Sequence, residues 1–323
     1  YGFSIYELEV YGTRAIEAAL LTDHGADSRG IHRLTGSWSD SRFADIDAAN
    51  GEDLTAYNMS EVSMPEGTSF STVNPNAVVI VTPGHKDADL LTNTANVLTE
   101  KSGAYSSKVI SYVDGNQVNT SLAIDAADAS LGRDVPAGVM GVAVPFAAAV
   151  PDGFKAYALN SAYKNGDKTV IQMKQVNTIA AGHPYVLHSV APARLNIAAP
   201  DAKVAFTEAQ EQADGVTAKT SFRNQPGATN LYTVDESGAA ALYSGNEIGT
   251  FRIYFQLPPE LAAPQVELQL EGVATVVSFE LIPVDGKVYT LDGRNLGKLT
   301  EQQMRDLPRG IYVMDGRRIM LGK

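Results

Sequence analysis

The chain has 323 residues, a formal net charge of −12, 44% hydrophobic and 19% charged residues, and no cysteine. This balance is typical of a folded chain, and the length fits two or three domains. The absence of cysteine excludes disulfides, thiolate nucleophiles, iron–sulfur clusters and Cys-ligated zinc. An acidic chain without a Lys/Arg cluster is a poor partner for nucleic acid or anionic membranes. The longest apolar stretch, 137–150, is too short to span a bilayer, so no membrane span is expected.

Residues 1–13 begin with the alternating pattern Tyr-Gly-Phe-Ser-Ile-Tyr-Glu-Leu-Glu-Val-Tyr-Gly, which predicts one β-strand. A lone strand needs partners for its backbone groups. The segment resembles the closing strand of discoidin (coagulation-factor type C) domains. The resemblance implies a truncated domain whose ligand-binding loops would lie upstream, and it carries over no binding residue. Because the chain begins with Tyr1 and no signal peptide precedes it, we expect a cut inside a longer protein.

Residues 14–125 combine a short helix with short strands. Ser39 is a candidate N-cap, Phe43, Ile46 and Ala49 share one helical face, and Gly51 ends the pattern. The motifs Leu-Thr-x-x-Asn-Met-Ser-x-Val and Asn-Pro-Asn-Ala-Val-Val then place turn residues before short apolar runs. These motifs resemble the irregular leucine-rich-repeat regions in surface proteins of the Bacteroidetes group, which implies one or two solenoid turns.

Two further strands, 108–113 and 121–125, follow this segment, and Asp114-Gly115 between them is a hairpin signal. We therefore expect these two strands to pair in the antiparallel sense. The hairpin would carry the chain into the next region.

Residues 126–285 are a series of short β runs with Gly, Pro and Asn turns, which predicts an antiparallel β-sandwich. The expected strands are 138–146, 154–159, 169–176, 184–188, 203–206, 230–234, 240–243, 250–256 and 265–270. Four blocks, 142–146, 150–157, 181–187 and 251–255, resemble a pattern near the C-termini of large exported proteins in the same bacterial group. This resemblance implies a structural or adhesive module with no assigned chemistry.

Residues 286–323 contain two strand–turn units, 288–294 and 311–317, each with Asp-Gly after an apolar run. Between them, 299–307 has helical spacing that Pro308 and Gly310 end. The unit resembles the C-terminal sorting domains of type IX secretion cargo. The resemblance implies a small β unit at this end and export from the cell.

The histidines are the first candidates for metal ligands, but their spacing favours solvated turns. No i, i+4 pair or H-x-H spacing occurs, and the acidic residues nearby lack the spacing of a calcium loop. We predict no metal site and no cofactor. The sets considered are His24 and His32 with Asp23 and Asp27, His85 with Asp87 and Asp89, and the separate His183 and His188.

No motif for catalysis is present. The chain has no G-x-S-x-G elbow, P-loop or Rossmann fingerprint, and no pair of acidic residues stands out as a glycosidase pair. We therefore predict no catalytic residue. Sugar binding would need exposed aromatic rings, and strand tyrosines usually fill cores. Trp38, expected to be packed, and Tyr163 with Asn165, expected in an exposed loop, are the candidate ligand-binding residues.

The predicted fold is mainly β: an antiparallel β-sandwich preceded by a short leucine-rich-repeat-like α/β segment and followed by a small C-terminal β unit. The predicted function is a non-catalytic accessory or spacer region of an exported or cell-surface bacterial protein, attached to a carbohydrate-active or adhesive upstream module. Two alternatives stay open, a glycan-binding β-sandwich module and a hydrolase. Candidate partners are glycans and neighbouring domains of the same parent chain, in a secreted or outer-surface location.

Overall fold

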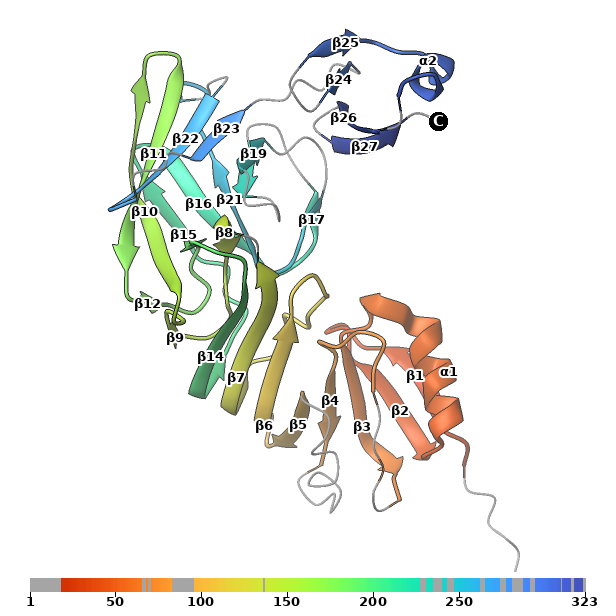
Figure 1. The fold of residues 1–323 in the computed structure, drawn as a ribbon. Coiled ribbons are helices and arrows are strands. Elements are labelled where there is room, and N and C mark those ends of the chain that lie inside the picture. Colours follow the sequence, from red (N-terminus) through yellow and green to blue (C-terminus); the bar gives the residue numbers. More distant parts are fainter. Residues whose placement is uncertain are drawn as a thin grey trace, which may run out of the picture.

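A computed structural model describes the chain from residue 19 to 321 with internal gaps, and its fold is mainly β (Figure 1). The predicted discoidin-like strand, 1–13, lies outside the described residues, and so do His85, Asp87 and Asp89. The described ranges are 19–65, 68, 71–82, 96–135, 137–226, 231–234, 240–242, 247–261, 265–273, 277–280, 287–290, 294–308, 310–314 and 317–321.

The first sheet has eight strands in the order β1-β2-β3-β4-β5-β6-β7-β14. The strands β2 to β5 pair in parallel, as do β6 and β7, whereas β1–β2, β5–β6 and β7–β14 are antiparallel. The strands are β1 Thr22–Ala26, β2 His32–Ser37, β3 Ala56–Ser63, β4 Val78–Val81, β5 Val97–Lys101, β6 Ala104–Val113, β7 Ile124–Val135 and β14 Ala193–Val204.

Helix α1, Asp40–Asn50, forms where the sequence predicts it and lies beside β1 and β2 (Figure 1). Ser39 caps it by accepting from the Arg42 N–H, and Gly51, at φ 69°, begins a short 3-10 turn, η1, Gly51–Asp53. Phe43 and Ile46 are buried as expected, but Ala49 is exposed.

The predicted hairpin at Asp114-Gly115 is wrong, because β6 and β7 run parallel, with Tyr105 opposite Ile124 and Val113 opposite Gly132. Residues 114–123 instead return the chain along the length of β6. At about 3.3 Å per residue they can span roughly 33 Å, which is enough for this return. The Asp-Gly pair makes a local turn, but it does not decide the direction of the next strand.

Buried asparagines hold the turns of the first sheet together. Asn76 donates to the carbonyls of Val113 and Asn116 at 2.9 and 3.1 Å, and its side-chain oxygen accepts from the Val113 N–H at 2.7 Å. Asn96 likewise donates to the carbonyls of Pro75 and Ser111. These amides pair backbone groups that no strand neighbour satisfies, which makes their burial tolerable.

The second sheet has eleven strands in the order β15-β16-β21-β18-β19-β23-β22-β11-β10-β13-β8. It is curled, since β8 at one end also contacts β21. The strands are β8 Gly138–Val142, β10 Phe154–Asn165, β11 Lys168–Val176, β13 Tyr185–Ser189, β15 Gln210–Ala213, β16 Val216–Ser221, β18 Leu231–Val234, β19 Ala240–Leu242, β21 Arg252–Gln256, β22 Gln265–Leu270 and β23 Val277–Glu280.

The prediction of a purely antiparallel arrangement is wrong for this sheet, because β11 pairs with β22, and β19 with β23, in parallel. Parallel neighbours need a long crossover, and here several other strands intervene in the sequence before each partner arrives. Turn residues predict only the pairing of strands that are adjacent in the sequence. They carry no information about the pairing of strands that are far apart in the sequence. Two short sheets, β9 Ala148–Ala149 with β12 Thr178–Ile179 and β17 Gln225–Pro226 with β20 Glu247–Ile248, lie beside the large one.

The four sequence blocks of the third region converge in this curled sheet. β10, β13 and β8 are neighbours in the sheet. The Ala143 N–H donates to the Phe251 carbonyl at 3.3 Å, and this hydrogen bond joins the block 142–146 to the block 251–255. A side chain at Gly141 would have its Cβ 2.5 Å from Cγ1 of Ile253. The blocks therefore mark close packing where the curl closes.

The chain passes between the two large sheets three times, from β7 to β8, from β13 to β14 and from β14 to β15. The predicted boundary between 125 and 126 falls inside β7, and one cluster of buried side chains runs from Ile31 to Leu270. A second cluster lies around α1 and the first strands.

Charged and aromatic side chains meet at the junction of the two sheets. The Asp114 carboxylate, beyond β6, accepts from the Arg252 guanidinium on β21 and lies 3.3 Å from the Arg133 Nε atom on β7. These three side chains are at most 13% exposed. Nearby, the Tyr112 ring lies 5.8 Å from Phe206 and 5.5 Å from Phe251.

The C-terminal sheet has four strands in the order β25-β24-β26-β27. Both predicted hairpins are confirmed, and helix α2 lies between them with a Thr300–Gln303 capping box. No helix in the described part of the chain is long and apolar enough to cross a membrane. The elements are β24 Val288–Thr290, β25 Asn295–Gly297, α2 Glu301–Arg305, β26 Gly310–Met314 and β27 Arg317–Leu321.

Candidate functional site

The candidate site is a polar face formed by β10, β11 and β22, where side chains of three neighbouring strands stand in rows. Side chains alternate between the two faces of a strand, so Val266, Leu268 and Leu270 of β22 point into the core while Glu267 and Gln269 point outward. The register places Gln269 beside Gln172 of β11, and Gln172 beside Ser161 of β10. Three polar side chains therefore form one row across the sheet.

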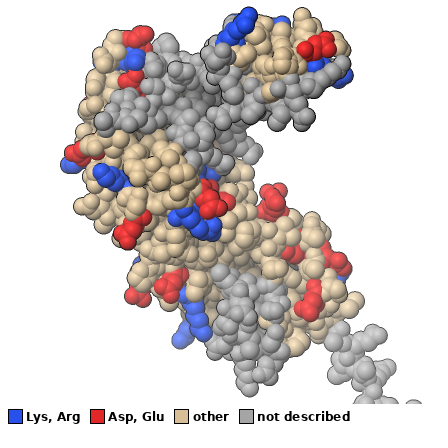
Figure 2. All heavy atoms as spheres, in the orientation of Figure 1, with Lys and Arg blue, Asp and Glu red and all other residues tan. Residues whose placement is uncertain are grey.

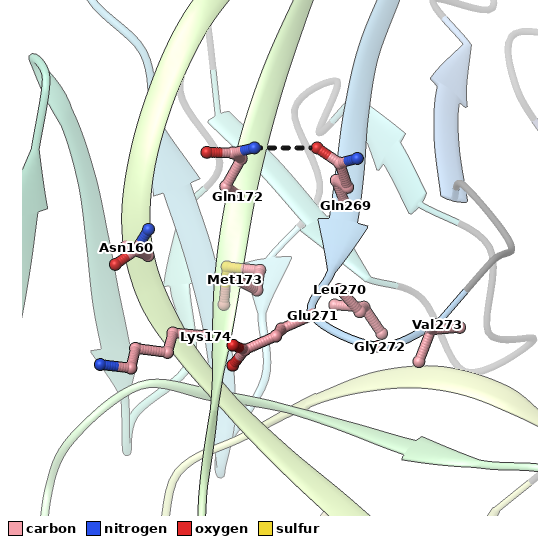
Figure 3. Close-up of a pocket in the computed structure, with 9 residues that line it drawn as sticks. All are labelled: Asn160, Gln172, Met173, Lys174, Gln269, Leu270, Glu271, Gly272 and Val273. Atoms are coloured by element: carbon pink, nitrogen blue, oxygen red, sulfur yellow. Dashed lines mark hydrogen bonds between the residues drawn. The ribbon is translucent and has the colours of Figure 1, made fainter.

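Hydrogen bonds order this row. The Ser161 hydroxyl donates to Oε1 of Gln172 at 2.7 Å, and Nε2 of Gln172 donates to Oε1 of Gln269 at 3.0 Å (Figure 3). Each amide uses only part of its hydrogen-bonding capacity in this chain. Gln269 is exposed and Gln172 is half-buried, so the remaining donors and acceptors can reach a ligand.

An open recess of about 700 Å³ lies along this row and continues past the end of β22. Figure 3 shows Asn160, Lys174 and Glu271 further along the strands from the two glutamines. All three are exposed. The recess is lined by Asn160, Gln172, Met173, Lys174, Gln269, Leu270, Glu271, Gly272 and Val273, which combine amides, one cation, one anion and apolar side chains.

Charges on this face are close to balance. Nζ of Lys168 lies 2.6 Å from Oε1 of Glu267, and this hydrogen bond, followed by the charge of Glu267, raises the pKa of Lys168. Glu271 accepts from the Gln175 N–H at 2.9 Å, which holds its carboxylate at the rim of the recess. Burial, and next the Glu271 charge, raise the pKa of Tyr157. The recess is therefore polar without a strong net charge.

Tyr163 lies on β10, opposite Val170, and not in a loop as predicted. The residue is 42% exposed, and it is the one aromatic residue among the exposed large hydrophobic residues of the described chain. Asn165, also exposed, ends the same strand opposite Lys168. The β10–β11 pairing extends to the turn at Gly166, which is why these residues join a strand.

Trp38 lies far from this face in the fold, on the α1 side of the first sheet. It packs at 4.9 Å on Phe43 and donates from Nε1 to Asp40 at 2.7 Å. The prediction that Trp38 is packed is confirmed. Its neighbours also belong to the cluster around α1, so the structure does not bring it together with Tyr163 and Asn165.

The histidines take part in local contacts. Nδ1 of His32 and Nδ2 of Asn50 lie 2.9 and 3.1 Å from Oδ2 of Asp23. Burial alone would raise the pKa of Asp23, but these hydrogen bonds and one from the Gly25 N–H lower it. His183 contacts Glu211 at 3.0 Å. In the part of the chain that the structure describes, no three His, Asp or Glu side chains gather to hold a metal ion.

Two other recesses are open and polar. One, of about 480 Å³, lies between the β1–β2 turn and the segment before β7, and includes Arg29, Asn119 and Arg223. The other, of about 320 Å³, is lined by Arg133, Arg194 and acidic partners at the sheet junction. In the first recess Arg29 pairs with Asp27. In the second, Arg133 pairs with Asp114 and Arg194 with Asp134. The β10–β11–β22 face differs from both in its row of hydrogen-bonded side-chain amides.

No family model, curated protein or solved structure matches the chain. Sequence reasoning named Tyr163 and Asn165 but missed Gln172, Gln269 and Glu271. The signal for the last two was present as alternation with Val266, Leu268 and Leu270. What the sequence does not show is that β22 lies beside β11.

Proposed function

We propose that the chain is a non-catalytic, rigid accessory or spacer region of an exported or cell-surface bacterial protein. Its finer architecture, in this proposal, is a leucine-rich-repeat-like segment followed by a β-sandwich-like region and a sorting-like C-terminal unit. The parallel strands β2 to β5 with buried asparagines support the first assignment. The curl of the eleven-stranded sheet supports the second.

The observation that carries the rigid-spacer role is the triple passage of the chain between the two large sheets. Two domains joined by a single linker can rotate about it, and such motion is the default unless the interface is large and apolar. Here bending would have to deform three connections at once.

The junction itself favours rigidity. Buried side chains of both sheets belong to one cluster. Separating the sheets would expose this apolar surface to water, at a free-energy cost of roughly 25 cal/mol per Å². The ion group of Asp114, Arg133 and Arg252 adds directional contacts to this apolar packing. A spacer that keeps a neighbouring module at a fixed distance and orientation needs both properties.

The exported setting rests on the sequence resemblances. The four blocks that converge around β8, β10, β13 and β21 resemble those of exported multidomain proteins, and the last region resembles a sorting unit. On this proposal the chain holds a carbohydrate-active or adhesive module away from the cell surface. Its partners are then neighbouring domains of the same parent chain.

Spin-label distance measurements test the rigidity directly, because the chain contains no cysteine and labels can be placed at will. Ala48→Cys on α1 and Asp167→Cys in the β10–β11 turn are both exposed and report across the junction. Asp152→Cys with Asp167→Cys gives a reference pair in the turns at the two ends of β10. We expect a single distance peak across the junction, about as narrow as the reference peak.

A cross-junction distribution that is broad or has several peaks, beside a narrow reference peak, would show a hinge and overturn the rigid-spacer role. Circular dichroism of each labelled variant checks that both pairs are read from folded protein.

A further inference from the structure

We propose that the face formed by β10, β11 and β22 binds a neutral oligosaccharide, with Gln172, Gln269 and Glu271 as hydrogen-bonding residues and Tyr163 as a stacking residue. This inference goes beyond the spacer role and does not depend on it. A rigid spacer without this site, and a glycan-binding module with a hinge, are both physically possible molecules.

The amide row supplies the recognition chemistry. A sugar presents neighbouring hydroxyls, each of which is both a donor and an acceptor, and a side-chain amide offers one acceptor and two donors. The Gln172–Gln269 hydrogen bond fixes both amides in one orientation, so less side-chain entropy is lost when a ligand binds. Ser161 fixes Gln172 from the other side. The row is thus ordered before a ligand arrives.

Glu271 and Asn160 extend the row toward the recess. The Glu271 carboxylate is held by the Gln175 N–H and still has free acceptor positions, since an ionised carboxylate accepts several hydrogen bonds. A charged acceptor makes stronger hydrogen bonds to hydroxyls than a neutral one. Val273, which is partly exposed, lines the same recess and offers apolar atoms to the C–H face of a ring.

Tyr163 extends the face in the opposite direction along β10. It stands two residues from Ser161, so it lies about 7 Å further along the same side of the strand. Asn165 follows after another two residues. From Asn165 to the row of Lys174 the face covers about 20 Å, given about 3.3 Å per residue. This length suits a short oligosaccharide better than a single sugar.

Charge decides between neutral and anionic glycans. The face has Lys168 paired with Glu267, and Lys174 is accompanied by Glu271 in the recess. Figure 2 shows basic and acidic side chains scattered over the visible surface without a basic cluster. With a net charge of −12 on the chain, an anionic glycan would be repelled at long range. The expected ligand is therefore uncharged.

The test uses the full chain with cellohexaose, xylohexaose, maltohexaose and the anionic control hexagalacturonate, followed by isothermal titration calorimetry and NMR. We expect one or more neutral hexasaccharides to bind and hexagalacturonate not to bind. Tyr163→Ala and the double variant Gln172→Ala with Gln269→Ala should each weaken binding at least tenfold. Gln256→Ala, an exposed glutamine on β21 of the same sheet, is the matched control and should leave binding unchanged.

Two results would overturn the inference. One is the absence of binding to these hexasaccharides and across a broad array of neutral glycans. The other is binding that the Tyr163 and Gln172–Gln269 variants leave within twofold of the unaltered chain. Thermal melting of each variant shows whether a loss of binding comes from unfolding. The spin-label experiment is independent, so the failure of one proposal is distinguishable from the failure of the other.

Discussion

Arg252 and Asp114, separated by 138 positions, form a two-pronged ion pair at the junction of the two large sheets. Their side chains are 11% and 13% exposed, and the Arg133 guanidinium approaches the same carboxylate. One buried anion therefore serves two buried cations. The group is placed where β6, β7 and β21 come together.

Removing Asp114 should destabilise the fold strongly, because it removes the carboxylate that both the Arg133 and Arg252 guanidinium groups contact. We expect Asp114→Ala to lower the free energy of unfolding by about 3–5 kcal/mol, the usual result of breaking a buried pair from one side. Urea denaturation followed by circular dichroism measures this change.

Arg194→Met is the matched control for this junction. Arg194 pairs with Asp134 nearby, but these side chains are 71% and 81% exposed, so the change should stay within about 1 kcal/mol. Equal losses for Asp114→Ala and Arg194→Met would contradict the assigned role of burial.

Asn76 should be as important as a large apolar core residue. Asn76→Ala removes three hydrogen bonds and leaves the Val113 N–H without its Asn76 acceptor, whereas the carbonyls of Val113 and Asn116 keep donors from Asn116 and Thr250. Each unsatisfied group costs about 1–3 kcal/mol, so we expect a loss of that order or larger in the free energy of unfolding. Asn224→Ala, at an exposed asparagine, should change stability little. A near-neutral Asn76→Ala would show that the first sheet does not depend on its buried amides.

Removing the hydroxyl from two buried tyrosines should change the free energy of unfolding differently. The Tyr57 hydroxyl donates to Asp47 at 2.8 Å, whereas the Tyr112 hydroxyl is buried with no hydrogen-bond partner. Burial raises the pKa of both, and for Tyr57 the hydrogen bond to Asp47 adds to the effect. We expect Tyr57→Phe to destabilise by about 1–3 kcal/mol and Tyr112→Phe to be neutral or stabilising. Thermal and urea unfolding of the two variants measure these changes. A destabilising Tyr112→Phe would contradict the burial of the Tyr112 hydroxyl without a hydrogen-bond partner.

His188 should make stability depend on pH. Burial, and next the charge of Lys155 directly opposite on β10, lower the pKa of His188 from its ordinary value of 6.5. The unfolded chain then binds the proton more readily than the folded one. The stabilising contribution is therefore present in full above pH 6.5 and is lost as the pH falls through the lower, folded value.

NMR titration of His188 checks this shift, and Lys155→Gln should move its pKa upward toward 6.5. The exposed His24 is the internal control, because its signals in the same spectrum should not change with the Lys155→Gln substitution. A titration of His188 that Lys155→Gln leaves unchanged would assign the shift to burial alone.

Local patterns predicted much of what is seen here. Ser39 and Gly51 bound α1 because capping chemistry acts within one turn of a helix. The C-terminal strands β24 and β25, and β26 and β27, pair as predicted because the two strands of each hairpin lie within a few residues of each other. Most of the strands predicted within 126–285 also form near their expected positions, since alternation of apolar and polar residues is a property of each strand alone, but β15, β16 and β23 were not predicted.

Tertiary structure decided which strands are neighbours. The partners of β11 and β22, of β6 and β7, and of β14 and β7 depend on which apolar faces can be buried together, and a strand's own sequence is compatible with many partners. The polar face follows from one such pairing. Gln172 and Gln269 are ordinary surface glutamines until the parallel register of β11 and β22 sets them side by side, 97 positions apart in the chain.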